Sequence, residues 1–300
     1  MRIITLGTGA GRPSVQRNAS AMAIEHEGDI LLFDCGEGTQ TQLMRSSLHW
    51  GRLEAIFIGH LHGDHVNGLP GLLATLSMSE RKTPLRLCGP KGLKKYLRIL
   101  QECKTLWIDF PLDILEIEES GRIHEAKRYW VEARPLDHVI PCWGYRFQEK
   151  PRPGHLDPER AAALGVPTGP LLGKLVEGEA VSLADGRIIH PDACVGPPIP
   201  GRSVAYCCDT KPCQACLELG DGVDWLVHEA TFDASMEKDA VEWGHSTNVG
   251  AARIASEAKA KQLLLTHISQ RYQDGGEFLA QAQEVFGASS LAADLETIEL

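Results

Sequence analysis

The stretch that decides the fold is "IFIGHLHGDHVNG", residues 56–68. An apolar run ends at His60, and His62 follows at the alternate position, so the end of a strand would point both imidazoles to the same side. The glycine that comes next permits a tight turn. Asp64 and His65 then stand where a helix is expected to begin. The pattern predicts two nitrogen ligands aimed at one point and an Asp/His pair aimed at a second point nearby.

Imidazole and carboxylate groups suit zinc, and also manganese, iron or cobalt. Two ions need more ligands than this turn supplies. Three later side chains, His138, Asp209 and His267, each end a strand-like run, and we expect them to complete the ligand set. A lone histidine is usually satisfied by ordinary hydrogen bonds. The histidines in polar or irregular contexts are accordingly predicted to be exposed: His26, His49, His124, His155 and His190.

Strand-like and helix-like segments alternate along the chain, which predicts an α/β or layered α+β protein. The main predicted strands are 2–7, 30–36, 54–60, 85–89, 130–138, 203–210, 224–230 and 262–267. The predicted helices are 38–47, 67–79, 90–102, 247–259 and 277–287. Several of the strands end in a polar residue, and rigid scaffolds present their chemistry at strand ends.

Residues 150–201 differ in composition from the rest of the chain, because they are rich in proline and glycine. They contain one helix candidate, 157–165, and weak strands around Asp185 and Gly186. Such a segment is a linker or an insertion. No second full domain follows it, so we predict a protruding insertion in a single domain spanning residues 1–300. It carries five basic residues (Lys150, Arg152, Arg160, Lys174, Arg187) and six acidic ones (Asp157, Glu159, Glu177, Glu179, Asp185, Asp192).

The composition predicts a cytoplasmic protein with reduced thiols. No apolar run approaches the roughly 18 residues of a membrane span, and the start lacks the features of a signal peptide. The nine cysteines include one C-x-x-C, Cys213 and Cys216, with no second pair nearby for a four-sulfur zinc site. Two thiols near the start of one helix, or a redox pair, remain the alternatives.

The net charge of −10 disfavours an indiscriminate nucleic-acid binder, because phosphate contacts need Lys and Arg. Local charge is different in residues 80–104, which hold eight basic residues against two acidic ones: Arg81, Lys82, Arg86, Lys91, Lys94, Lys95, Arg98 and Lys104 against Glu80 and Glu102. This segment is either a phosphate-facing patch or a solvated helix face.

The pattern H-x-H-x-D-H followed by distant His, Asp and His resembles the metallo-β-lactamase superfamily. Within it, the chain closely resembles the ribonuclease Z family, the tRNA 3′-processing endonucleases, in its short form. The segments that carry this resemblance include "LLFDCGEGTQTQLMR" (31–45), "GVPTGPLLGK" (165–174), "LVHEATF" (226–232), "GHSTNVGAARIA" (244–255) and "LLLTHISQRY" (263–272). The later segments are far more specific than the metal motif, which the whole superfamily shares.

The resemblance implies an αββα sandwich with two zinc ions between its sheets. One zinc ion would be held by His60, His62 and His138, the other by Asp64, His65 and His267, with Asp209 bridging them. Asp34 matches a motif whose aspartate supports the ligand loop through hydrogen bonds. The alternative role for Asp34, capping the following helix, fits Thr39 better.

The resemblance also implies catalytic roles. Asp64 would act as the base, and Glu229 would orient His245 as the acid that protonates the leaving oxygen. The products would be a 3′-hydroxyl on the tRNA and a 5′-phosphate on the trailer. The alternative for "GHST" is helix capping by Ser246 or Thr247, and both functions are compatible.

Substrate contacts follow from the same resemblance. In the family a flexible arm grips the tRNA elbow while the active site of the dimer partner cuts, and Gly169 and Pro170 match the glycine-proline element of that arm. Arg17 and Asn18 match a loop linked to the CCA end of tRNA. Val15 stands where the family often has lysine, which predicts weaker contacts with the acceptor end and less discrimination against mature CCA-bearing tRNA.

Two other readings compete with the endonuclease. The first is another metallo-β-lactamase-fold phosphodiesterase, or an arylsulfatase-like hydrolase, acting on small molecules; such enzymes need no tRNA arm, so residues 150–201 argue against it. The second is a binding protein on a catalytically dead scaffold, which usually entails lost ligands, and none is lost here.

Overall fold

The computed structural model describes residues 1–272 and 275–300, and these form two compact units. The first unit comprises Met1–Ala126, Trp130–Phe147 and Ser203–Leu300. The second comprises Lys127–Tyr129 and Gln148–Arg202. The first unit carries all the predicted metal ligands.

Two seven-stranded sheets form the centre of the first unit. The first sheet has the order β16 (Thr297–Glu299), β1 (Arg2–Gly7), β2 (Ala21–His26), β3 (Asp29–Phe33), β4 (Leu53–Phe57), β5 (Leu85–Gly89) and β6 (Leu112–Glu116). The second has the order β15 (Ser289–Leu291), β14 (Gln262–Thr266), β13 (Trp225–Glu229), β12 (Ser203–Cys207), β9 (Cys142–Glu149), β8 (Tyr129–Leu136) and β7 (Gly121–Glu125).

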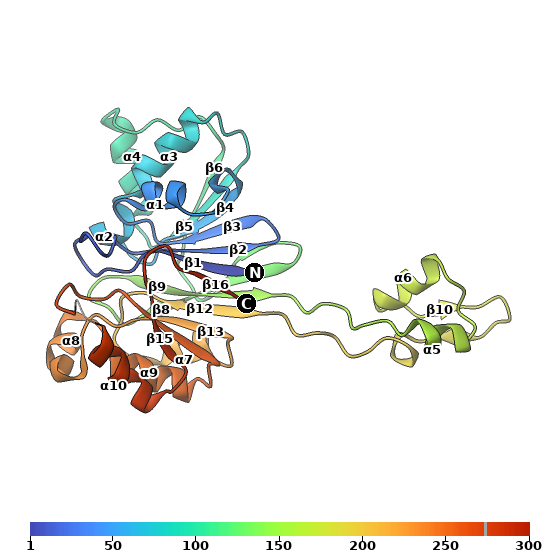
Figure 1. The fold of residues 1–300 in the computed structure, drawn as a ribbon. Coiled ribbons are helices and arrows are strands. Elements are labelled where there is room, and N and C mark those ends of the chain that lie inside the picture. The colour runs from blue at the N-terminus through green and yellow to red at the C-terminus, as the bar shows by residue number, and fades with distance from the viewer. Residues whose placement is uncertain (273–274) are drawn as a thin grey trace. The chain divides into compact units, whose positions relative to one another are not determined.

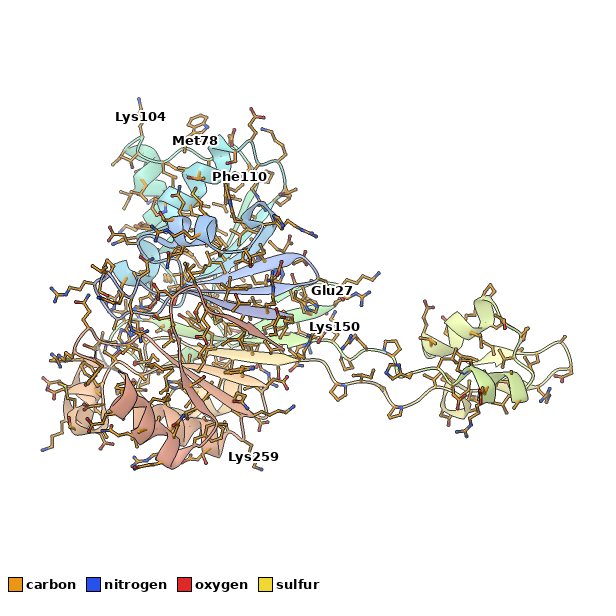
Figure 2. The ribbon with its side chains drawn as sticks, viewed as in Figure 1. Glu27, Met78, Lys104, Phe110, Lys150 and Lys259 are labelled. Carbon is orange, nitrogen blue, oxygen red and sulfur yellow. The ribbon has the colours of Figure 1, made fainter. Side chains whose placement is uncertain are left out.

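Helices cover the outer face of each sheet, which confirms the predicted αββα layering (Figure 1). On the first sheet lie α1 (Thr39–Arg45), α3 (Leu69–Met78) and α4 (Leu93–Glu102), and the short α2 (Gly63–Val66) precedes α3. On the second lie α7 (Gln214–Gly220), α9 (Asn248–Glu257) and α10 (Gly276–Val285), with α8 (Glu237–Trp243) leading into α9. Figure 2 shows Met78 and Lys104 at the surface of the first helical layer and Lys259 at the surface of the second.

Strand β3 is apolar from Ile30 to Phe33, and both of its faces are buried there. Ile30 and Leu32 join the core beneath the helices of the first layer. Phe33 points the other way and stacks on Phe57 of β4, with ring centroids 5.1 Å apart. The ring of Tyr145, from the second sheet, lies 5.9 Å from Phe33 and 5.5 Å from Phe57. These rings hold the two sheets together.

Polar residues follow the carboxyl ends of the parallel strands, and these strand ends lie at one edge of the sandwich. β3, β4 and β5 run parallel in the first sheet, and β12, β13 and β14 run parallel in the second. Parallel strands end on the same edge, so the segments that follow them meet there. Asp34 follows β3, Asp209 follows β12, and His267 follows β14.

The second unit has a small apolar core of its own: Ala161, Val166, Leu175, Val181, Ile189 and Cys194. Its elements are α5 (Pro158–Ala163), α6 (Pro170–Val176), β10 (Val181–Ser182) and β11 (Ile188–Ile189). Asp157 caps α5 by accepting a hydrogen bond from the Arg160 amide at 2.9 Å. Residues 148–202 therefore hold local structure that their proline and glycine content alone does not indicate.

Some sequence expectations were wrong. Thr39 is the first residue of α1 rather than its cap: Gly38 occupies the cap position, and the Thr39 hydroxyl donates back to the Gly36 carbonyl at 2.7 Å. His26 is buried, with 1 % of its surface exposed, and its ring packs against Phe147. His124 is half-buried.

The predicted basic segment contains one side chain that faces inward. Arg81 is buried and donates hydrogen bonds to the carbonyls of Thr83, Leu53 and Pro84. The lysines of α4 are exposed, as a solvated helix face requires. Within residues 1–272 and 275–300, no helix combines the length and the apolar character needed to cross a membrane.

Candidate metal centre

The first ligand set lies where β4 and β8 end. His60 Nε2 lies 3.0 Å from His62 Nδ1, and His138 Nε2 lies 3.4 Å from the same His62 nitrogen. Asp209 adds its Oδ2, 3.6 Å from His60 Nε2. His60 is fully buried, whereas His62 and His138 are half-buried. Three imidazole nitrogens and one carboxylate oxygen thus converge on one point.

The second ligand set lies beside the first. His65 Nε2 and His267 Nε2 are 3.3 Å apart. Asp64 Oδ2 lies 3.3 Å from His267 Nε2 and 3.5 Å from His65 Nε2. Asp209 contributes its other oxygen, Oδ1, at 3.2 Å from His65 Nε2. The seven predicted ligands therefore come together as two sets that share Asp209, and four atoms of each set lie within 4.8 Å of one another.

The electrostatics of Asp209 fit a bound cation. Its carboxylate is 2 % exposed, and Oδ1 makes no hydrogen bond within the described residues. Burial alone would raise its pKa, but His267, His65 and His60 outweigh burial and hold the pKa well below the usual range. A buried carboxylate oxygen without a hydrogen-bond partner, surrounded by imidazole nitrogens, is costly unless a cation satisfies it. This cluster is a divalent-metal binding site.

Other groups orient the ligands. His138 Nδ1 donates to the Gly244 carbonyl at 2.7 Å, and His267 Nδ1 donates to the Thr231 hydroxyl at 2.8 Å. Such bonds fix which ring nitrogen is left for the metal.

Asp34 supports the ligand loop through hydrogen bonds, as the family resemblance implied. Its Oδ2 accepts hydrogen bonds from His65 Nδ1 and from the Tyr206 hydroxyl, both at 2.8 Å, and its Oδ1 accepts from the Gly59 amide at 2.7 Å. One buried carboxylate therefore links the turn before His60, the helix that bears His65, and a strand of the other sheet.

Glu229 and His245 form a hydrogen-bonded pair at the edge of the second ligand set. His245 Nδ1 donates to Glu229 Oε1 at 2.9 Å. Glu229 also accepts hydrogen bonds from the amides of Thr210, Thr231 and Ser246. Burial lowers the pKa of His245, but the carboxylates of Glu229 and Asp209 outweigh it and raise the pKa to about 9. This balance favours the protonated imidazole. Thr247 caps α9 through the Gly250 amide, so both predicted functions of "GHST" fit together.

A cleft of about 320 Å³ opens over both ligand sets. Its lining includes His62, Asp64, Asp209, His245 and His267. The sequence reasoning did not single out several of the other lining residues: Ala10, Gly11, Thr231, Phe232, Trp243, Ser269 and Arg271. The Gly11 amide donates to Asp64 Oδ2 at 2.8 Å. The sequence does not indicate this contact, because every residue type except proline can donate a hydrogen bond through its backbone amide.

The predicted substrate-binding residues lie elsewhere. Arg17 lines a neighbouring cavity of about 800 Å³, and it donates through one nitrogen to the Thr8 hydroxyl and the Ala292 carbonyl. Asn18 donates to the Glu37 carbonyl at 2.9 Å. Val15, on the same loop, is 99 % exposed. Gly169 and Pro170 begin α6 in the second unit.

Known proteins are similar to this chain over its whole length. Ribonuclease Z of Bacillus cereus (strain B4264) is 44% identical over 302 residues, which cover 99% of this chain and 98% of the relative. Ribonuclease Z of Bacillus thuringiensis (strain Al Hakam) is 45% identical over 302 residues, with the same coverage. This chain belongs to the ribonuclease Z family.

Solved structures agree with membership of the ribonuclease Z family. The crystal structure of human tRNase Z, short form, matches with a TM-score of 0.70 and 31% identity, covering 100% of this chain and 99% of that one. The metallo-β-lactamase fold protein YhfI of Bacillus subtilis matches with a TM-score of 0.71 at 18% identity, which concerns the fold alone. Residues 1–104 match the family described as anti-Pycsar protein Apyc1, and residues 180–268 match the β-lactamase superfamily domain.

Proposed function

We propose that this chain is a metal-dependent endonuclease that removes the 3′ trailer from precursor tRNA. The observation that carries the proposal is the cleft in which two ligand sets share Asp209, in a chain related to ribonuclease Z over its whole length. The products would be a 3′-hydroxyl on the tRNA and a 5′-phosphate on the trailer.

The proposed cofactor is a pair of zinc ions per chain, for which manganese, iron or cobalt are possible substitutes. His60, His62 and His138 would hold one ion and Asp64, His65 and His267 the other, with one oxygen of Asp209 toward each. Bound metal ions supply Lewis acidity that activates water at neutral pH and stabilises charge on phosphoryl oxygens. Nitrogen and oxygen donors in this number fit zinc.

Asp64 is the proposed base. Its Oδ2 faces the cleft between the Gly11 amide and His267 Nε2, so it is placed to orient the attacking water and accept its proton. The Gly11 hydrogen bond stabilises the ionised carboxylate, which is the form that accepts a proton.

His245 is the proposed acid, and Glu229 positions it. The hydrogen bond from His245 Nδ1 to Glu229 leaves Nε2 to deliver a proton to the departing O3′ of the tRNA. The raised pKa keeps that proton in place at neutral pH. Departure of O3′ as a hydroxyl matches the proposed products.

Residues 150–201 are proposed as the arm that binds tRNA. The unit that contains them has its own apolar core, and its charges nearly cancel, which favours shape recognition and backbone hydrogen bonds over bulk phosphate attraction. Gly169 and Pro170 at the start of α6 are proposed contacts, together with Arg17 and Asn18 on the loop of the first unit. A cytoplasmic homodimer, in which the arm of one copy serves the cleft of the other, completes the proposal.

The test compares two substrates. Purified protein is incubated with a 3′-extended precursor tRNA, with and without a chelator, next to an Asp64→Ala variant. We expect cleavage at the trailer junction that both the chelator and the substitution abolish. Hydrolysis of bis(p-nitrophenyl) phosphate with an untouched precursor tRNA would instead favour a small-molecule phosphodiesterase.

A deletion tests the arm. Arg152 and Ile199 exchange two backbone hydrogen bonds of 2.9 Å, so they mark a natural point at which to close the chain. Replacing residues 153–198 with a short glycine linker should abolish cleavage of precursor tRNA and spare hydrolysis of the small ester. Retention of both activities would contradict the proposal that residues 150–201 bind tRNA.

A further inference from the structure

A second group of metal-ligating side chains lies on the far face of the second sheet. Cys207 in β12 and His228 in β13 are direct register partners. Their chain neighbours Tyr206 and Glu229 bond to Asp34 and His245 in the metal centre. Side chains alternate across a strand, so Cys207 and His228 point away from that centre, toward the layer that contains α7.

The start of α7 brings two more sulfurs to this place. Cys213 occupies the N-cap position of α7, and Cys216 lies in the first turn of that helix. The Cys216 amide donates to the Cys213 carbonyl at 3.1 Å. Their Sγ atoms are 3.5 Å apart. The sulfur atoms of Cys207 and Cys216 and a ring nitrogen of His228 lie within 4.8 Å of one another. Two sulfurs on one tetrahedral zinc, each about 2.3 Å from the ion, stand roughly 3.8 Å apart.

The side chain of His228 indicates a bound ion independently of the cysteines. Its side chain is completely buried, its Nδ1 donates to the Glu229 carbonyl at 2.7 Å, and its Nε2 makes no hydrogen bond within residues 1–272 and 275–300. A buried nitrogen without a partner is costly. A ring whose Nδ1–H is held by a carbonyl presents a bare Nε2 lone pair, which is the usual pose of a metal-binding histidine.

We propose that Cys207, Cys213, Cys216 and His228 bind a structural zinc ion. Three sulfurs and one nitrogen make a closed tetrahedral set with no position left for a substrate. Cys207, Cys216 and His228 are fully buried, and their ligand atoms all lie within 4.8 Å of one another. The half-buried Cys213 lies outside that group, with its Sγ 3.5 Å from Cys216 Sγ, and its side chain must turn toward the ion to become the fourth ligand. The ion ties β12, β13 and the start of α7 together, and thereby anchors the turn that carries Asp209. Cys207 and His228, in two neighbouring strands, supply the further ligands that the single C-x-x-C lacks in the sequence.

Cobalt substitution distinguishes this site from the metal centre. Thiolate ligands give Co²⁺ an intense charge-transfer absorption in the near ultraviolet, whereas the ligands of the metal centre are nitrogens and oxygens. The full-length protein is stripped of metal, reloaded with Co²⁺ alone and scanned. Zinc content per chain is measured in parallel on protein purified under reducing conditions.

Three single variants sharpen the test. Cys213→Ser removes the half-buried ligand and should eliminate most of the thiolate band and lower zinc by about one ion per chain. Cys103→Ser, an exposed cysteine after α4, is the matched control and should leave both unchanged. Cys142→Ser controls for the other buried thiols: Cys142 Sγ lies 3.2 Å from Cys208 Sγ, and this pair is close to His60.

Several results would overturn the proposal. One is a folded wild-type protein, verified by circular dichroism, that shows no thiolate band with Co²⁺. Another is a band that disappears in Cys142→Ser and persists in Cys213→Ser. A third is a Cys213–Cys216 disulfide, detected by mass spectrometry, in protein that holds zinc only at the metal centre. If Cys213→Ser does not fold, the wild-type and Cys142→Ser spectra decide.

Discussion

His65 Nδ1 lies 2.8 Å from Oδ2 of Asp34, and neither side chain has any exposed surface. Asp34 sits in the left-handed backbone region, with φ of 58°, so the chain accepts strain to place this carboxylate. The contact fixes the ring of a proposed metal ligand from behind, and the same carboxylate holds the Gly59 amide at the start of the ligand loop.

Replacing Asp34 with asparagine should weaken metal binding by about 10- to 100-fold, because the ligand ring loses its charged partner. Competition with a chelating dye measures the affinity. Tyr206→Phe is the control, since it removes one hydrogen bond to Asp34 and leaves the His65 contact; we expect a smaller effect. Unchanged affinity in Asp34→Asn would contradict the assigned role.

The His245→Ala variant should lose about 10²- to 10⁴-fold in kcat on precursor tRNA, because the leaving O3′ needs a proton. Hydrolysis of bis(p-nitrophenyl) phosphate should change only a few-fold, since p-nitrophenolate leaves without protonation. Metal content serves as the control and should stay constant. Equal losses on both substrates would show that His245 does not act as the acid.

Glu229→Gln should destabilise the fold as well as slow the reaction. The carboxylate accepts hydrogen bonds from three backbone amides, and an NH₂ group in place of one oxygen leaves at least one donor unsatisfied. That costs about 1–3 kcal/mol. Urea unfolding measures the loss, with His245→Ala as the comparison, because His245 is only half-buried. Equal stability of the two variants would argue against this account.

Gly59 and Cys208 are predicted to be coupled. A Cβ atom at position 59 would overlap the Cys208 sulfur, so Gly59→Ala should cost about 1–3 kcal/mol. Adding Cys208→Ala removes the sulfur and should recover part of that loss. A double-mutant cycle by thermal or urea unfolding gives the coupling energy. Additive effects would mean that the backbone shifts instead.

Val15→Lys should increase discrimination against CCA-bearing tRNA without altering stability. Val15 is 99 % exposed beside the cavity that Arg17 lines, so the change should stay within about 0.5 kcal/mol. The measurement is the ratio of cleavage rates for precursors with and without the CCA sequence. Val15→Gln is the uncharged control and should resemble the wild type.

The ligand set was predictable because His60, His62, Asp64 and His65 are closely spaced in one turn, and because His138, Asp209 and His267 each end a strand-like apolar run. His138 and His267 are far from His60 along the chain, and they were selected by this feature together with the resemblance to the metallo-β-lactamase superfamily. Asp34 likewise follows an apolar run, and its hydrogen bonds matched the expectation.

Contacts that depend on the backbone or on tertiary packing were not predictable. The Gly11 amide reaches Asp64 through a loop whose residue types reveal nothing. His26 looked exposed because its neighbours are polar, but it packs on Phe147 of the other sheet. The C-x-x-C looked isolated because Cys207 and His228 meet it only through sheet pairing.

His60, His62, Asp64 and His65 lie within the first quarter of the chain, whereas His267 follows β14 near its end. Strand β1 also pairs with β16, the final strand, through Arg2 and Glu299. During synthesis the ligand set therefore becomes complete only after nearly the whole polypeptide has left the ribosome. A nascent chain halted before β14 lacks His267, so the second ligand set stays incomplete until synthesis is nearly finished.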